Sequence, residues 1–200
     1  MSTLLRGPGS LALLGEAARS TNRPARGGAD SWFAQLEEIW PDGGGHKRIE
    51  QPLTRHAARK GFRMTIAQED EQLIGFAYGH VGSPGEWWHD SIEAAMTLAQ
   101  RQTWLAPGHF ELLELHLRPD CRRRGIGSAL HDAVLEELTS QTVVASIRTN
   151  NTAALGLAGS KGYQVVLSDF RFARGDAPYC ILGLARRSSK GGVTKPRRRL

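Results

Sequence analysis

The sequence has little of what marks several large classes of protein. Its two cysteines, Cys121 and Cys180, do not form a Cys-x-x-Cys pair, which argues against a disulfide framework and a cysteine zinc motif. Its seven histidines include no His-Glu-x-x-His motif and no pair at metal spacing beside a carboxylate, so we predict no metal site. No apolar run approaches the ~18 residues of a transmembrane helix. The apolar run at 10–14 is too short for a signal peptide, so we expect a cytoplasmic protein without membrane partners.

The net charge of +6 is concentrated at the two ends of the chain. Residues 1–29 carry +3 and residues 186–200 carry +7, which leaves −4 for residues 30–185. A run of basic residues is usually a solvated segment. Because no helix-turn-helix or RNA-binding aromatic pattern accompanies it, we do not expect nucleic acid as a partner. Nucleic-acid binding through Arg186–Arg199 stays as an alternative function.

Composition divides the chain into one domain with two basic ends. Residues 1–30 are rich in Gly, Ala, Arg and Ser and predict a mobile basic arm. Residues 31–185 have the length and the apolar content of a single domain. Residues 186–200 predict a disordered basic tail.

Apolar periodicity predicts an α/β fold. The expected helices are at 31–40, 49–60, 91–102, 125–139 and 151–161, and the expected strands are at 62–67, 72–81, 110–117, 142–148, 163–168 and 179–185. A hairpin followed by strand–helix–strand–helix–strand predicts a mixed sheet with a parallel portion and flanking helices. Before the first helix only the short runs STLL and SLALL are available, and neither makes a convincing strand, so the first strand is left open.

One segment carries the main chemical signal. Leu117–Leu130 reads LRPDCRRRGIGSAL: a strand end, three arginines, Gly125 and Gly127, then a helix. Backbone N–H groups at a helix N-terminus bind anions, and glycine lets the backbone approach a phosphate closely. Arginines add charge-assisted hydrogen-bond donors. The segment therefore predicts a phosphate or pyrophosphate site.

Other interpretations of this loop are open at this point. A dinucleotide-binding Rossmann unit would place a small residue where Leu130 stands, although Arg148 would suit a 2′-phosphate. A Walker loop is excluded because no Gly-Lys-Ser/Thr follows. An ordinary strand–turn–helix with a basic turn also fits.

Two motifs resemble one known family. Arg122-x-x-Gly125-x-Gly127, after a strand and Pro119, resembles motif A of the GCN5-related N-acetyltransferase (GNAT) superfamily. Asn151-x-x-Ala154 followed by Gly162-Tyr163 is similar to its later motif. The resemblance covers about residues 60–185, and the segments GFAYGHVGSPGEWWHD and FELLELHL resemble actinobacterial-type members. It implies a centrally splayed sheet and an acetyl-CoA-dependent N-acetyltransferase, without a metal, that acts on a primary amine by direct attack.

The resemblance also implies a set of coenzyme-binding residues. They are Leu115 and Leu117 through their backbone, Arg122, Arg123, Arg124, Gly125, Ile126 and Gly127 around the pyrophosphate, and Asn151 at the coenzyme arm. The family often has a tyrosine acid where this chain has Ala158. Either the thiolate leaves without a dedicated acid, or Tyr163 or a water replaces the tyrosine. A non-catalytic acyl-CoA-binding or sensory module is the alternative. Ser146 stands where the family's N-terminal protein acetyltransferases often carry an acid, which weighs against a ribosomal-protein substrate and favours a small molecule.

An acetyl acceptor amine must lose a proton, so the reaction needs a base. Strand alternation predicts Glu111, Leu113, Leu115 and Leu117 on one face and Phe110, Leu112, Glu114 and His116 on the other. Glu111, eleven residues before Arg122, is the first candidate base, and Glu114 and His116 are the next. The alternative for Glu111 is that it solvates a strand end.

Residues 82–108 form a long segment in which acids stand beside aromatic residues, a combination that suits a cationic or aromatic acceptor. The predicted acceptor-binding residues are Trp87, Trp88 and Asp90 of this segment, with Tyr78 and His80 from the strand before it. The alternative for the two tryptophans is that at least one packs over the core. The oligomeric state is left open, a homodimer included.

Overall fold

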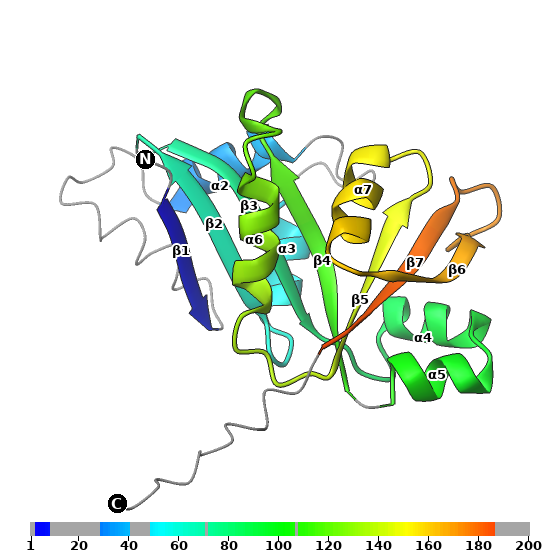
Figure 1. Cartoon of the computed structure of the whole chain (residues 1–200). Coiled ribbons are helices and arrows are strands. Elements are labelled where there is room, and N and C mark those ends of the chain that lie inside the picture. The colour runs from blue at the N-terminus through cyan, green and yellow to red at the C-terminus, as the bar shows by residue number, and fades with distance from the viewer. Residues whose placement is uncertain (1–2, 9–28, 41–48, 71, 107, 187–200) are drawn as a thin grey trace, which may run out of the picture.

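One sheet of seven strands organises this computed structural model, which describes residues 3–8, 29–40, 49–70, 72–106 and 108–186 (Figure 1). The strand order is β1-β2-β3-β4-β5-β7-β6. The strands are β1 (Thr3–Pro8), β2 (Arg63–Glu69), β3 (Gln72–Val81), β4 (His109–Leu117), β5 (Thr142–Arg148), β6 (Gln164–Phe170) and β7 (Tyr179–Ala185). Neighbouring strands are antiparallel except β4 and β5, which are parallel. The predicted mixed α/β sheet is therefore confirmed.

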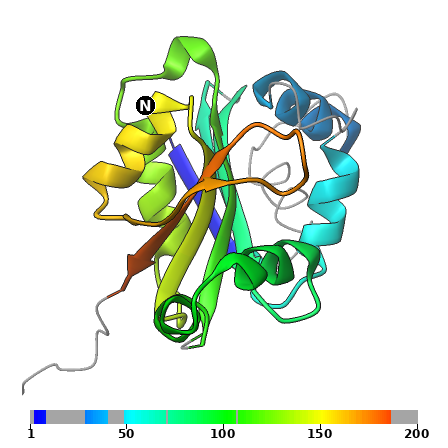
Figure 2. The same cartoon turned by 90° about the vertical axis from the view of Figure 1, so that its right-hand side faces the viewer.

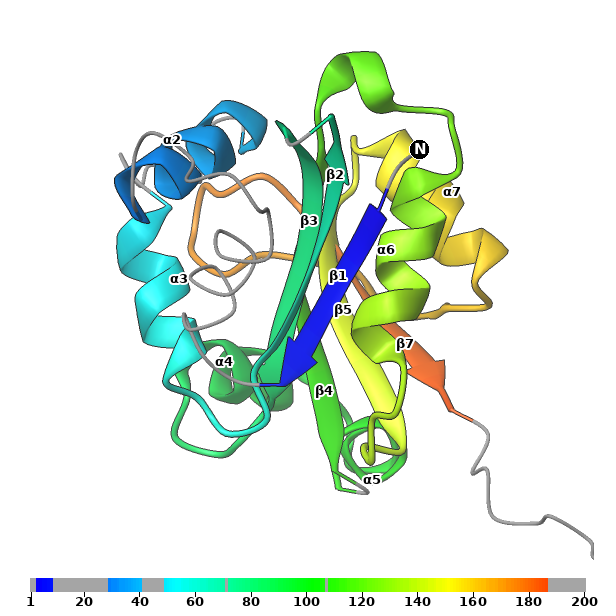
Figure 3. The ribbon, with the colours of Figure 1, turned by 90° about the vertical axis from the view of Figure 1, so that its left-hand side faces the viewer.

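Helices cover both faces of the sheet. They are α2 (Ala29–Ile39), α3 (Glu50–Ala57), α4 (Trp87–Ala95), α5 (Leu98–Trp104), α6 (Ile126–Leu135) and α7 (Thr152–Ser160), with a short 3-10 helix at Pro119–Cys121. Figures 2 and 3 show α6 and α7 on one face and α2 and α3 on the other. Because both faces of β3 are covered, every residue from Leu73 to His80 is buried. Among the residues described, no helix has the length and hydropathy needed to cross a bilayer.

The two parallel strands separate soon after they pair. Only three residues of each take part, His109–Glu111 of β4 and Thr142–Val144 of β5. Beyond them β4 continues beside β3 and β5 continues beside β7, and Figure 1 shows the two strands diverging. The edge of Leu112–Leu117 that would face β5 has no strand partner in the described chain, so its N–H and C=O groups are free for a ligand. This is the central splay that the resemblance implied.

A bulge in β4 changes which side chains share a face. The pairing with β3 shifts between Tyr78 and Gly79, whose partners are Glu114 and Leu112, so Leu113 is an extra residue. Leu112, Leu115 and Leu117 consequently all pack with the apolar cluster under α6, whereas Leu113 packs with the cluster under α2 and α3. The predicted simple alternation along this strand is therefore wrong.

The bulge places the three candidate bases in one row. Glu111, Glu114 and His116 lie opposite His80, Tyr78 and Phe76 of β3. Phe76 and Tyr78 belong to the apolar cluster under α2 and α3. The polar row on β4 therefore faces that side of the sheet, away from α6.

The helix predicted at 91–102 is two helices. Met96 has extended backbone with ψ of 146°, which ends α4. Thr97 then begins α5 with a capping box, in which its Oγ1 accepts from the Gln100 N–H and the Gln100 side chain accepts from the Thr97 N–H. The capping signal was present in the sequence but was hidden by the continuous helical composition around it.

The first strand, which the sequence left open, is β1 at Thr3–Pro8. It pairs antiparallel with β2, from Thr3 opposite Gln68 to Pro8 opposite Arg63. The prediction of a mobile arm over residues 1–30 is therefore wrong for 3–8, and also for 29–30, which begin α2. Residues 9–28 lie outside the described residues.

Arg186, predicted to begin a disordered tail over 186–200, is held by the fold. The Arg186 guanidinium donates to the carbonyl oxygens of Leu135, Leu138 and Ser140 around the end of α6. The last carbonyl groups of a helix have no hydrogen-bond donor inside the helix, and Arg186 supplies donors at this end of α6. Burial lowers the pKa of Arg186. Residues 187–200 lie outside the described residues.

Candidate active site

The segment between β4 and α6 has the backbone of an anion-binding loop. Gly125, directly before α6, has φ of 80°, and Arg123 has φ of 63°. Left-handed residues among right-handed ones turn successive N–H groups toward one side. The N–H groups of Arg123, Arg124 and Gly125 donate no hydrogen bond within the described chain. A side chain at Gly125 would meet open space. The predicted residues thus form a loop that can receive a phosphate.

Three elements converge at Gly127 in the first turn of α6. A Cβ there would lie 3.3 Å from Leu117 Cδ1, 3.7 Å from Leu115 Cδ2 and 3.9 Å from Leu157 Cδ2 of α7. Glycine therefore lets the helix approach the unpaired end of β4. Ile126 beside it is buried in the cluster under α6. The loop at Arg122–Gly127 and the backbone of Leu115 and Leu117, all predicted to bind the coenzyme, consequently lie together.

The three arginines of this loop are not equivalent. Arg124 is ion-paired with Glu69 of β2, at 2.6 Å between Nη2 and Oε1, and this hydrogen bond raises its pKa. Arg122 and Arg123 are exposed and form no ion pair in the described chain. They are therefore the two whose guanidinium groups are available to an anion.

α7 begins on the other side of the opening. Its N-cap is Asn151, whose Oδ1 accepts from the Ala154 N–H at 3.1 Å. This capping role explains the Asn-x-x-Ala spacing in local terms. The Asn151 side chain is exposed, and its Nδ2 has no partner in the described chain, which leaves a donor for a coenzyme.

Glu114 and His116 form a close pair where β4 is no longer paired with β5. Glu114 Oε2 and His116 Nε2 are 2.6 Å apart, and both side chains are about a quarter exposed. A carboxylate accepts, so Nε2 carries the proton and donates it. Nδ1 is then left with its lone pair, and it has no hydrogen-bond partner within the described chain. Tyr78 beside them is fully buried, which raises its pKa, and its hydroxyl is 3.3 Å from His56 Nδ1.

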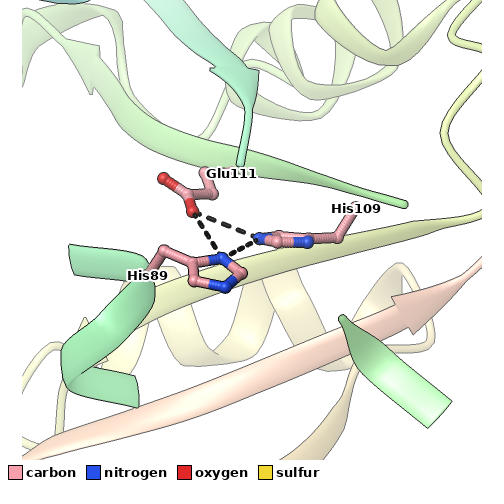
Figure 4. Close-up of side chains that lie close together, drawn as sticks. All are labelled: His89, His109 and Glu111. Atoms are coloured by element: carbon pink, nitrogen blue, oxygen red, sulfur yellow. Dashed lines mark hydrogen bonds and ion pairs between the residues drawn. The ribbon is translucent and has the colours of Figure 1, made fainter. Parts of the chain in front are cut away.

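Glu111 lies in a buried histidine cluster (Figure 4). Its side chain is 1% exposed, so the alternative that it solvates a strand end is wrong. Oε1 is 3.2 Å from His109 Nε2 and 3.9 Å from His89 Nδ1. Oε2 has no hydrogen-bond partner in the described chain. His80, predicted to bind the acceptor, is also buried, with Nδ1 3.9 Å from Oε2 and 3.1 Å from the Val81 carbonyl oxygen.

The predicted acceptor residues on α4 have different environments. Trp87 is 68% exposed, and its ring lies 5.1 Å from that of Phe172 in the turn after β6. Trp88 is half-buried and donates Nε1–H to Ser146 Oγ of β5 at 3.3 Å. The packing interpretation therefore holds for Trp88. Asp90 is exposed and accepts from the Gly85 N–H.

Tyr163 lies in a contact between α6 and the segment that follows α7. Its hydroxyl is 3.2 Å from His131 Nε2, and burial raises its pKa. His131 Nδ1 is 3.1 Å from Asp132 Oδ1, so Nδ1 donates and Nε2 accepts from Tyr163. The hydroxyl proton of Tyr163 is thus engaged in a packing contact, which weighs against the predicted role of Tyr163 as the acid.

Comparison with known proteins assigns the family. The model of the acetyltransferase (GNAT) family matches residues 29–163, more than half of the chain. The chain belongs to the GNAT family. GNAT enzymes use acetyl-CoA as donor, so the prediction of an acetyltransferase with that donor is confirmed at the level of the family.

One curated relative of this GNAT chain is a GCN5-like protein acetyltransferase of Mycobacterium tuberculosis. It is 30% identical over 121 residues, which cover 56% of this chain and 57% of the relative. The chain thus matches little more than half of that protein's length. Its mycobacterial source agrees with the actinobacterial resemblance of the sequence.

Solved GNAT structures share the fold. The ribosomal-protein-S18-alanine N-acetyltransferase of Escherichia coli has a TM-score of 0.56 at 16% identity, covering 92% of this chain and 94% of that one. The PaiA N-acetyltransferase of Thermoplasma acidophilum, in complex with coenzyme A, has a TM-score of 0.51 at 15% identity, covering 92% and 99%. At these identities the likeness confirms the architecture.

Sequence analysis missed the histidines around Glu111. His109 and Glu111 are two residues apart on a strand, a spacing that places both on one face, and this signal was available. His89 comes from α4, and no spacing rule connects it with β4. His56 comes from α3 and is 22 residues away in sequence from Tyr78, the residue that it contacts.

Proposed function

We propose that this GNAT protein transfers an acetyl group from acetyl-CoA to a primary amine, with the His116–Glu114 pair accepting the proton. The observation that carries the proposal is the position of this pair on β4. It lies in the segment where β4 is no longer paired with β5. The anion-binding loop lies at the end of the same strand.

The residues around the opening suit the coenzyme. The free N–H groups of Arg123–Gly125 and the guanidinium groups of Arg122 and Arg123 would hold its pyrophosphate. The unpaired backbone of Leu115 and Leu117 would hold the pantetheine arm and the acetyl carbonyl. Acetyl-CoA supplies the activated thioester.

His116 is suited to take the proton of the attacking amine. Its Nε2–H is held by Glu114, so Nδ1 presents the lone pair that a general base needs. Glu114 fixes the tautomer and stabilises the imidazolium that forms. Glu111, the first candidate from the sequence, is enclosed by histidines and is less accessible to an amine.

A small cationic amine is the acceptor we propose. On α4 the exposed Trp87 and the exposed Asp90 are three residues apart, a spacing that places both on one side of the helix. An aromatic face with nearby acids attracts an ammonium group. Peptide amines belong in the same screen, because the mycobacterial relative is described as a protein acetyltransferase.

A thiol-release assay over small amines and peptides tests the proposal. His116→Asn and Glu114→Gln should lower kcat by about 10²- to 10⁴-fold, the usual range for a general base. Acetyl-CoA affinity, measured by calorimetry, should stay unchanged in both. Glu137→Gln, an exposed acid after α6, is the matched control and should behave as wild type.

Two results would contradict the proposal. If the variants kept full kcat with an amine that the wild type acetylates, the pair would not be the base. If acetyl-CoA bound but no amine or peptide released thiol, the chain would be an acyl-CoA-binding module.

A further inference from the structure

The cluster around Glu111 has no part in the proposed reaction. His109 and Glu111 reach it from β4, and His89 reaches it from α4 (Figure 4). The three side chains are almost fully buried, at 1%, 1% and 3% exposure. They come from segments that are far apart in sequence, and their polar atoms face one another.

The arrangement of three atoms has the dimensions of a metal site. His109 Nε2 is 3.2 Å from Glu111 Oε1 and 3.4 Å from His89 Nδ1, and Oε1 is 3.9 Å from Nδ1. A point equidistant from atoms with these separations is about 2 Å from each, the bond length of Zn²⁺ to nitrogen and oxygen ligands. We propose that His89, His109 and Glu111 bind a zinc ion, with a fourth position for a water or a further ligand.

Hydrogen bonding alone accounts poorly for the same contacts. His109 Nε2 can carry one proton, and it faces both an oxygen and a nitrogen. If it donates to Glu111, its lone pair is gone and it cannot accept from His89. Glu111 Oε2 is buried and has no hydrogen-bond partner in the described chain. A buried carboxylate with so few donors is stabilised by a nearby positive charge, which a divalent cation supplies.

The surroundings of the cluster fit this assignment. Glu93, one turn after His89 on α4, has Oε2 3.9 Å from His89 Nε2, the nitrogen that points away from the cluster. Ligating histidines commonly have a carboxylate behind them. A Cβ on Gly82 would lie 2.0 Å from His109 Nε2 and 2.3 Å from Glu111 Oε1. Glycine at this position therefore leaves room for the three ligands to converge.

His80 is outside the ligand set. Its Nδ1 is 3.1 Å from the Val81 carbonyl oxygen, which can only accept, so Nδ1 carries a proton and has no lone pair to give. Nδ1 lies 3.9 Å from Glu111 Oε2 and 3.8 Å from Glu86 Oε2. Glu86 is in turn ion-paired with Arg59 at 2.9 Å. These groups surround the cluster on the side of β3.

An ion here would fix α4 to the sheet. Glu111 pairs with Val144 in the last rung that joins β4 to β5. The ion would therefore lie where the sheet opens, and it would hold the helix that carries Trp87 and Trp88.

Metal binding to the full chain tests the inference directly. The purified protein is stripped with a chelator and titrated with Co²⁺ and Zn²⁺. We expect about one ion per chain and the visible absorption of four-coordinate cobalt, displaced by zinc. A wild-type chain that binds neither ion at micromolar concentration would overturn the inference, whatever its acetyltransferase activity.

Variants locate the ion. His109→Gln and Glu111→Gln should each weaken Co²⁺ binding at least about 100-fold, and Glu93→Gln about tenfold, as the loss of an outer partner does. His131→Gln, a buried histidine outside the cluster, should bind as wild type. Unchanged Co²⁺ binding in the two ligand variants, with folding verified by circular dichroism, would contradict the assignment. If those variants fail to fold, the wild-type titration still decides.

Discussion

At the scale of single residues, the anion-binding loop depends on backbone angles. Gly125 is left-handed where α6 begins, and no neighbouring atom forces the choice of glycine. Glycine is therefore required here for its left-handed backbone angle. The same angle determines where the free N–H groups point.

Gly125→Ala should weaken acetyl-CoA binding more than it weakens the fold. A non-glycine residue at φ of 80° costs about 1–2 kcal/mol, and relaxing that strain turns the N–H groups away from a phosphate. Calorimetry with acetyl-CoA measures the affinity, and urea unfolding measures stability. Gly162→Ala is matched, because Gly162 has φ of 84° and equally open space. Equal losses of affinity in the two variants would refute a special role for Gly125.

The candidate site residues show which parts of the site a sequence can indicate. The loop residues are contiguous, so motif spacing located them, and His116 and Glu114 were candidates because they stand on the same strand. Two facts depended on three-dimensional structure. The Arg124 guanidinium is ion-paired with Glu69, which lies 55 residues away in sequence. His89 meets Glu111 only because α4 packs against the sheet.

At the scale of elements, the break between α4 and α5 depends on one cap. Thr97→Ala removes the acceptor for the Gln100 N–H and should lower the free energy of unfolding by about 1 kcal/mol. Thr103→Ala is the control. Its hydroxyl donates to the Ala99 carbonyl within α5, and its loss is offset by the better helix propensity of alanine. Urea unfolding of both variants should show a loss only at Thr97.

The contact between α6 and the segment after α7 predicts a pH dependence. Burial lowers the pKa of His131 below the ordinary histidine value of about 6.5. The unfolded chain then binds more protons than the folded one, so stability is full above about pH 6.5 and falls as the pH drops toward the folded pKa. For Asp132, burial raises the pKa, but hydrogen bonds from Lys161 and His131 lower it to a net value below 3.8, so its contribution is lost only in stronger acid.

Urea unfolding between about pH 7 and pH 5 should therefore show a decrease in stability that is smaller in His131→Gln. An equal decrease in the variant would assign the effect to other groups. Acetyl-CoA affinity provides an independent check that the variant is folded.

At the scale of the whole molecule, Arg186 should mark where the fold ends. A chain ending at Arg186 should unfold like the full chain and bind acetyl-CoA equally well. Arg186→Ala in the full chain removes the donor of the Leu138 and Ser140 carbonyls and one of the two donors of the Leu135 carbonyl, and should cost about 1–3 kcal/mol of unfolding free energy. Any salt-sensitive DNA binding should disappear with residues 187–200 alone. If coenzyme binding disappeared with them, the tail would be part of the site.

The architecture was predictable because each strand and helix carries its own periodic signal. The order of elements then left few ways to build the sheet, and β3, β5 and β7 lie at their predicted bounds. The bulge at Leu113 was not predictable, because an extra residue leaves no mark in an apolar strand. β1 was missed because its six residues are paired with β2 on one side only, and a short edge strand has little pattern of its own.

Only three rungs between β4 and β5 join the two parts of the seven-stranded sheet, β1–β4 and β5–β7. A coenzyme bound between β4 and β5 would hold these two parts together. Its concentration would therefore determine how often they separate. At about 100 times its Kd a ligand adds about 2.7 kcal/mol to stability. Without acetyl-CoA, β5–β7 should open first to proteases and hydrogen exchange. The lifetime of the protein in a cell would then follow the supply of its own substrate.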